Sequence, residues 1–166
     1  MSFEVSFEYR EDTTIISFTG AIDENADFTS FKPVDTQHLI LDLKEVNLLN
    51  SVGLRNWINW IRTLPNLEVI EMRNCTVAVI NQVSVLEGFV PLNGVIHSFE
   101  VPYLCDSCET EIAFWAKRGT DYQERTADKD EWNKIPTQME CPKCGKTSEM
   151  DVIAAKYFRF LSKKSA

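Results

Sequence analysis

The chain has 166 residues, of which 44% are hydrophobic, so it can form one domain or two small ones with a packed core. The formal net charge is −8, which argues against binding to nucleic acid or to an anionic membrane surface, because both require positive charge on the protein. Residues 1–100 carry 6 Lys/Arg against 14 Asp/Glu, whereas residues 101–166 carry 11 of each. This change coincides with the first pair of cysteines, and we therefore expect a domain over residues 1–102 and a separate module over residues 103–166.

The first residues do not read as a signal peptide, because they have neither a basic start nor a long apolar run. No stretch approaches the ~20 apolar residues that a membrane-spanning helix needs. We expect a cytoplasmic protein with no membrane partner, in which thiols stay reduced.

The N-terminal part predicts a β-hairpin. Residues 3–9 alternate apolar with polar side chains, and residues 13–19 form a second β-rich run. Asp23 is a candidate N-cap for a short helix that reaches Phe31 and is stopped by Pro33.

The next stretch predicts a buried strand that leads into a helix. Leu39–Leu43 is nearly continuous and apolar, as in a strand covered on both faces, and after a short turn Asn50-Ser51 opens the helix. At ~100° per residue, the apolar side chains of this helix fall within an arc of roughly 160°. They are Leu54, Trp57, Ile58, Trp60, Ile61 and Leu64. We expect both tryptophans in the core, although Trp60 lies at the edge of the arc and could instead face a partner or a pocket.

The remaining elements complete an α/β pattern. Leu67–Met72 predicts a strand, Thr76 is a candidate cap for a helix that continues to Phe89, and Val95–Tyr103 predicts the last strand of the domain. Strands that alternate with helices indicate a mixed β-sheet covered by helices.

One stretch resembles a known family. Leu39–Leu43, Val46 and the run Leu49-Asn50-Ser51-Val52-Gly53-Leu54 resemble the STAS domain, the fold of bacterial anti-sigma-factor antagonists, in which an apolar strand precedes Asp-Ser-Ser/Thr-Gly-Leu at a helix start. The run Gly20-Ala21-Ile22-Asp23 adds to the resemblance, which covers about residues 1–102.

The resemblance implies a non-enzymatic signalling protein in a partner-switching system. Its partner would be an anti-sigma factor that is also a serine kinase, and phosphorylation of the serine that matches Ser51 would break the complex. Asn50 replaces the family's Asp, Val52 replaces its second Ser/Thr, and no helix follows Val95–Tyr103 to match the family's C-terminal helix.

We expect the partner to bind the polar face of the helix after Ser51. This candidate surface consists of Asn50, Val52, Arg55, Asn56 and Asn59. Ser51 itself is either the phosphorylation site or a plain helix cap within a partner-binding surface.

Two Cys-x-x-Cys pairs predict a metal site in the second module. The cysteines are Cys105, Cys108, Cys141 and Cys144, and Gly145 can adopt the positive φ that such a turn favours. Four thiolates match structural zinc and leave no open coordination position, so the module resembles a zinc ribbon with zinc as its cofactor. A redox pair and two disulfides fit a cytosolic chain less well, whereas ligand identity alone does not separate zinc from an iron–sulfur cluster.

The module contains few apolar residues, so metal binding should supply much of its stability. The 32 residues between the pairs include a charged segment, 118–134, that predicts a long loop or hairpin. Asp151 is a candidate cap for a helix over Val152–Ser162.

Other polar residues suggest no chemistry. Neither His38 nor His97 lies in a triad-like pattern, and Cys75 reads as a buried small apolar residue. We therefore expect no enzyme. The alternatives to a phosphorylated switch are an unphosphorylated scaffold or ligand-binding subunit of a larger assembly, and an enzyme or nucleic-acid-binding regulator that uses the metal.

Overall fold

The computed structural model describes residues 2–29 and 36–162. The contacts among them divide the chain into two compact units, Met1–His97 and Ser98–Ala166. The predicted boundary near residue 102 lies inside strand β6 of the second unit.

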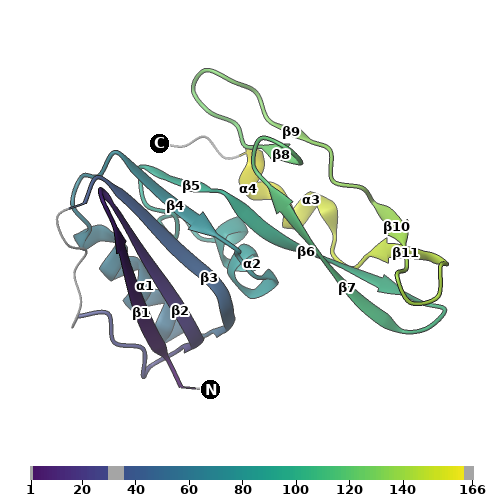
Figure 1. Cartoon of the computed structure of the whole chain (residues 1–166), viewed down its shortest axis with the longest axis horizontal. Coiled ribbons are helices and arrows are strands. Elements are labelled where there is room, and N and C mark those ends of the chain that lie inside the picture. The colour runs from purple at the N-terminus through teal and green to yellow at the C-terminus, as the bar shows by residue number, and fades with distance from the viewer. Residues whose placement is uncertain (1, 30–35, 163–166) are drawn as a thin grey trace. The chain divides into compact units, whose positions relative to one another are not determined.

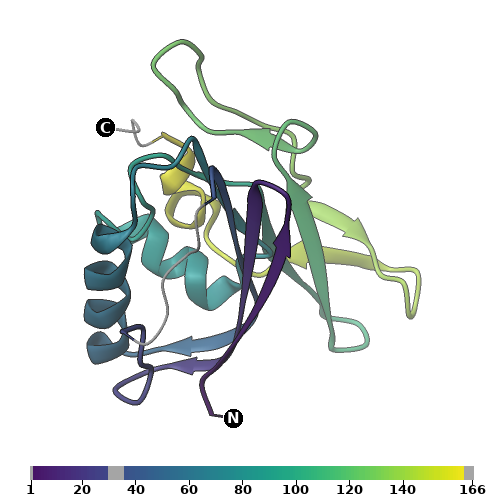
Figure 2. The same ribbon diagram turned by 60° about the vertical axis from the view of Figure 1, so that its left-hand side comes forward.

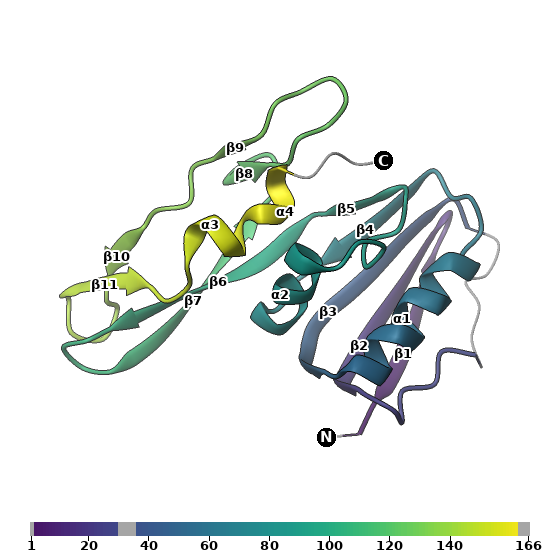
Figure 3. The same ribbon diagram turned by 180° about the vertical axis from the view of Figure 1, so that it is seen from behind.

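The first unit is a mixed sheet with two helices. Its described elements are β1 (Glu4–Arg10), β2 (Thr13–Ile22), β3 (His38–Leu49), α1 (Ser51–Thr63), β4 (Val69–Arg73), α2 (Val77–Val85) and β5 (Gly94–Ile96). The strands follow the order β1-β2-β3-β4-β5, with β1 antiparallel to β2 and every other pair parallel. Helices α1 and α2 cover the same face of this sheet, as Figures 1 and 3 show. The predicted mixed α/β sheet is confirmed.

An aromatic core lies between the sheet and α1. Trp57 is fully buried and Trp60 is 6% exposed, and both rings contact Phe18 of β2, with centroids 5.4 and 5.8 Å away. The indole of Trp57 also donates a hydrogen bond to the carbonyl of Phe89, at 3.0 Å. Trp60 is therefore a core residue, and the alternative that it faces a partner is wrong.

Figure 2 shows α1, in blue, and α2, in teal, on the same side of the strands.

Gly53 permits the close contact between α1 and β2. A Cβ at this position would lie 1.9 Å from the carbonyl oxygen of Ile22 and 2.7 Å from the backbone nitrogen of Asp23. Because both atoms belong to the backbone, only glycine fits without a shift of the main chain.

Three predicted elements of the first unit differ from the structure. Strand β3 continues to Leu49 instead of ending in a turn after Leu43. No helix occurs over the described residues 23–29, because the side chains of Asp23 and Asp27 accept hydrogen bonds from the backbone two residues ahead and so favour turns. The predicted end of that helix at Phe31 and Pro33 lies outside the described residues.

The predicted strand Val95–Tyr103 is in fact two strands in two sheets. Strand β5 pairs with β4 in the first unit, whereas β6 (Ser98–Cys105) pairs with β7 and β11 in the second. Only His97 separates them, so their continuous β-forming sequence gives no sign of the change of sheet.

The second unit is a long antiparallel sheet with short elements around it. Besides β6 it contains β7 (Thr110–Lys117), β8 (Tyr122–Gln123), β9 (Trp132–Asn133), β10 (Gln138–Glu140), β11 (Thr147–Met150), α3 (Ala154–Tyr157) and α4 (Arg159–Ser162). The main sheet has the order β10-β11-β6-β7, and β8 pairs with β9 inside the predicted long hairpin.

The C-terminal segment packs on β6 as two short helices rather than the predicted single one (Figure 3). The chain leaves α-helical geometry at Phe158, and Asp151 donates its backbone N–H to Pro102 instead of capping a helix. The ring of Phe99 contacts Phe160 at 5.2 Å, and the hydroxyl of Tyr157 donates to the carbonyl of Glu100. These contacts anchor both helices on the sheet.

Candidate functional site

The four predicted metal ligands come together at one end of the second unit. Cys105 ends β6, Cys108 lies in the turn to β7, and Cys141 and Cys144 lie in the turn between β10 and β11. Their sulfur atoms all lie within 4.8 Å of one another, and all four thiols are free. Such a cluster can hold a metal ion.

Two short sulfur–sulfur distances join one pair to the other. They are 3.5 Å between Cys105 and Cys144 and 3.6 Å between Cys108 and Cys141. In a tetrahedral four-thiolate zinc site, sulfurs ~2.3 Å from the metal lie ~3.8 Å apart. The cluster therefore has the size of such a site.

In both turns, the residue directly after the second cysteine has a positive φ. Gly145, directly after the second pair, has φ 75°, as predicted, and Glu109, directly after the first pair, has φ 57°. In the second turn the backbone N–H of Gly145 also bonds to the carbonyl of Cys141, at 2.9 Å. Sequence reasoning anticipated the left-handed position after Cys144 but not the one at Glu109, where no glycine marks it.

Hydrogen-bond donors favour the thiolate form of three cysteines. The pKa of Cys105 is lowered, mainly by the backbone N–H of Cys108, and the pKa of Cys141 is lowered, mainly by the backbone N–H of Cys144. The hydroxyl of Thr110 is the main cause that lowers the pKa of Cys108. Thiolates are the forms that bind metal, so these donors prepare the site for a cation.

Cys144 differs from the other three cysteines because it is exposed. Its pKa is raised to about 11: the backbone N–H of Lys146 favours the thiolate, but the sulfur of Cys105, desolvation, and the sulfurs of Cys108 and Cys141 together outweigh it. A bound cation would reverse this repulsion.

The second candidate site is the junction between β3 and α1. Asn50 is the N-cap of α1: its side-chain oxygen accepts a hydrogen bond from the backbone N–H of Gly53, at 2.9 Å. The side-chain nitrogen of Asn50 donates to the carboxylate of Glu24, at 2.6 Å. Ser51 is the first helical residue and is exposed. The interpretation of Ser51 as the helix cap is therefore wrong.

The candidate partner-binding residues lie on the outer face of α1. Val52, Arg55 and Asn59 are exposed, and Asn56 is half-buried. Spacings of three and four residues place them on one side of the helix, away from Trp57. Their role in binding stays a prediction.

The structure adds two residues next to this surface that were not predicted from the sequence. Leu48, near the end of β3, is 53% exposed, compared with 43% for Val52, so the junction carries two exposed apolar side chains. Glu24 is exposed, and its own backbone N–H and then the Asn50 amide lower the pKa of its carboxyl group. No sequence signal links Glu24 to Asn50, because 26 residues separate them.

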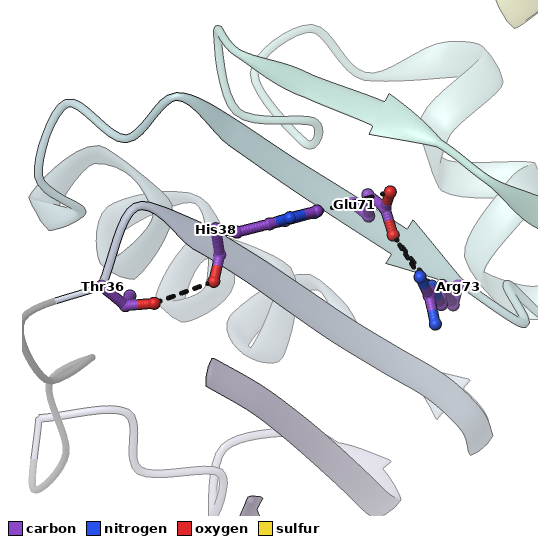
Figure 4. Close-up of polar contacts among 4 residues, drawn as sticks. All are labelled: Thr36, His38, Glu71 and Arg73. Atoms are coloured by element: carbon purple, nitrogen blue, oxygen red, sulfur yellow. Dashed lines mark hydrogen bonds and ion pairs between the residues drawn. The ribbon is translucent and has the colours of Figure 1, made fainter. Parts of the chain in front are cut away.

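The first sheet also carries a polar group on the face opposite α1 and α2, drawn in Figure 4. The guanidinium of Arg73 donates to Glu71 from Nε at 2.9 Å and Nη2 at 2.6 Å, and Nε2 of His38 lies 3.5 Å from the other oxygen of Glu71. The hydroxyl of Thr36 donates to the carbonyl of His38 at 3.0 Å. The hydroxyl of Thr36 donates to a carbonyl and not to the imidazole, so the group is an ion pair of Arg73 and Glu71 with His38 beside it, and it holds no activated nucleophile.

Cys75 is fully buried, and burial, with the nearby charge of Asp42, raises its pKa. The prediction that it is a small core residue is confirmed.

No protein-family model matches this chain, and no curated protein matches it either. Among the described helices, none has the length and apolar character needed to cross a bilayer.

Proposed function

We propose that the chain is a cytoplasmic, non-enzymatic signalling protein of the STAS type, which binds an anti-sigma factor or serine kinase and is switched by phosphorylation of Ser51. The observation that carries this proposal is the division of roles at the β3–α1 junction. Asn50 caps the helix, so Ser51 is exposed at the helix start and is not needed for the cap.

The surroundings of Ser51 suit binding to a protein. Leu48 and Val52 give exposed apolar surface, and Arg55 and Asn59 continue the surface along α1. Glu24, held by Asn50, puts a carboxylate beside the position where the family carries its Asp. The acidic character that the resemblance associates with position 50 is thus available from another segment.

A phosphate on Ser51 would change binding while the fold remains. Phosphorylation adds a charge of about −1.5 to −2, and the free N–H groups at the start of a helix can accommodate it. The phosphate would join the carboxylate of Glu24 in one small region. A partner surface that packs on Leu48 and Val52 would have to desolvate both charges, and this cost favours release.

We propose zinc as the metal of the four-cysteine site, with a structural role. Four thiolates complete a tetrahedral coordination shell and leave no position for a substrate. This supports a stabilising rather than a catalytic metal.

The experiment is co-expression with each anti-sigma serine kinase encoded by the source organism, followed by intact-mass measurement and binding titration. We expect one added phosphate with a single kinase, no phosphate on Ser51→Ala, and loss of binding after phosphorylation. Ser6→Ala, at an exposed position in β1, is the matched control. If a kinase binds but adds no phosphate, the chain is an unphosphorylated scaffold, and if none binds, the proposal is wrong.

A further inference from the structure

Two hydroxyl side chains lie next to the four-cysteine cluster, one on each strand that flanks Cys105. On β7, Thr110 pairs directly with Cys105. On β11, Glu149 pairs with Leu104 and Met150 with Tyr103, and this antiparallel register, continued by one residue, brings Ser148 opposite Cys105.

All three side chains lie on the same face of the sheet, because directly opposed residues of antiparallel strands share a face. Cβ atoms of such neighbours are ~4.5–5.5 Å apart, which is within reach of a hydroxyl and a sulfur. The row Thr110, Cys105 and Ser148 therefore crosses the metal-binding end of the sheet.

The first hydroxyl already contacts a ligand sulfur. Oγ1 of Thr110 lies 3.0 Å from Sγ of Cys108. A metal-bound cysteine has lost its proton, so in the loaded site the hydroxyl is the donor and the sulfur the acceptor.

The second hydroxyl lacks a partner. Ser148 is 0% exposed, and its Oγ forms no hydrogen bond within the described part of the chain. A buried hydroxyl without a partner is destabilising, because it has given up its hydrogen bonds to water. Such a group is uncommon, and its place opposite Cys105 gives it an acceptor as soon as that sulfur carries a charge.

We propose that Thr110 and Ser148 are positioning residues for the metal, and that their hydroxyl groups donate hydrogen bonds to the ligand thiolates. Four thiolates around a divalent ion leave a net charge of −2 at this end of the sheet. Cys105 is buried and Cys108 is half-buried, so water reaches these two sulfurs poorly, and the two hydroxyls replace it as donors. Partners of this kind typically change metal affinity 10- to 100-fold.

The test uses the full chain loaded with Zn²⁺ or Co²⁺. Affinity is measured by competition with a chromophoric chelator, and the sulfur-to-cobalt charge-transfer band is recorded for Thr110→Val, Ser148→Ala and Thr110→Ser. We expect Thr110→Val and Ser148→Ala each to weaken binding ~10-fold or more and to move the band to lower energy, because thiolates without donors lose electrons more easily. Thr110→Ser, which keeps the hydroxyl, should behave as wild type.

Thr147→Val is the matched control, since Thr147 is an exposed neighbour on β11 with its side chain on the other face. Ser148→Ala gives the sharpest outcome. If Ser148 served packing alone, removing an unpaired buried hydroxyl would leave affinity unchanged or raise it.

Three results would overturn the proposal. The first is wild-type metal affinity in both Thr110→Val and Ser148→Ala, and the second is weaker binding in these variants with an unmoved charge-transfer band. The third is a loss of affinity in Thr147→Val as large as theirs. A wild-type chain that binds neither ion would overturn the metal centre as well. None of these four results bears on the switch proposed for Ser51.

Discussion

The first unit is organised around a continuous aromatic core, whereas the second is anchored at two places along one strand. In the first, the rings of Phe18, Phe28, Trp57, Trp60 and Phe89 contact one another between the sheet and α1. In the second, Phe99 contacts the C-terminal helices near the start of β6, and Cys105 belongs to the four-cysteine cluster at the end of the same strand. Those two anchors lie six positions apart, or ~20 Å along the strand.

This difference shows how each unit offsets the entropy of folding. The first unit buries large side chains, each worth ~1.5–3 kcal/mol or more, and forms no cluster of metal ligands among its described residues. At the metal end of the second unit, β10 and β11 contribute three and four residues, and Ser148 is their one buried side chain. A metal bound at this end would supply stability that apolar packing there does not.

The largest expected effect comes from removing the metal. A strong chelator, or Cys105→Ser, should unfold the second unit and leave the first folded, because metal binding supplies ~10 kcal/mol or more in small zinc modules. Heating with and without chelator, followed by hydrogen exchange of α1 and β3 in the first unit and of β6 and β11 in the second, checks this. One cooperative transition in which both units melt together would contradict the separation.

Gly53→Ala should give the next largest effect, confined to the first unit. The added methyl group would overlap the backbone of Ile22, and overpacking of this kind costs up to ~3 kcal/mol. Urea unfolding monitored by tryptophan fluorescence measures the loss. Asn59→Ala, at an exposed position of the same helix, is the control and should change stability little. A Gly53→Ala protein as stable as wild type would show that the helix does not lie this close to β2.

Asn50→Ala should have the smallest effect on stability. It removes the hydrogen bond to the N–H of Gly53, and loss of an N-cap costs ~1 kcal/mol. Asn50→Asp keeps the cap but places a second carboxylate beside Glu24, so it should be less stable at low salt than at high salt. The measurement is the free energy of unfolding of both variants at two ionic strengths. Equal stability of Asn50→Ala and wild type would mean that Ser51 takes over the cap.

Features set by local pattern could be predicted from the sequence. The spacing of Trp57, Trp60 and Ile61 predicted the buried face of α1, and Thr76 was predicted correctly as the cap of α2. The two Cys-x-x-Cys pairs predicted the cluster because two residues between cysteines suffice to turn the chain.

Features that depend on distant partners could not be predicted. Strand β3 extends past Leu43 because its backbone pairs with β2 through two register shifts, although Lys44, Glu45 and Asn47 read as a turn. The chain changes from one sheet to the other at His97, because β5 pairs in the first unit and β6 in the second. The local β propensity is the same before and after His97, so the sequence does not mark the change. The bond between Glu24 and Asn50 and the row through Ser148 likewise come from tertiary pairing.

The order of the units along the chain has a consequence for synthesis. The first unit is one continuous segment that ends at His97, and Cys144 follows 47 residues later. At ~5–20 residues per second, roughly 2 to 9 s pass between completion of that segment and completion of the ligand set. The segment that carries Ser51 can thus fold before the last cysteine of the cluster is made, so its folding during synthesis does not have to wait for a metal ion.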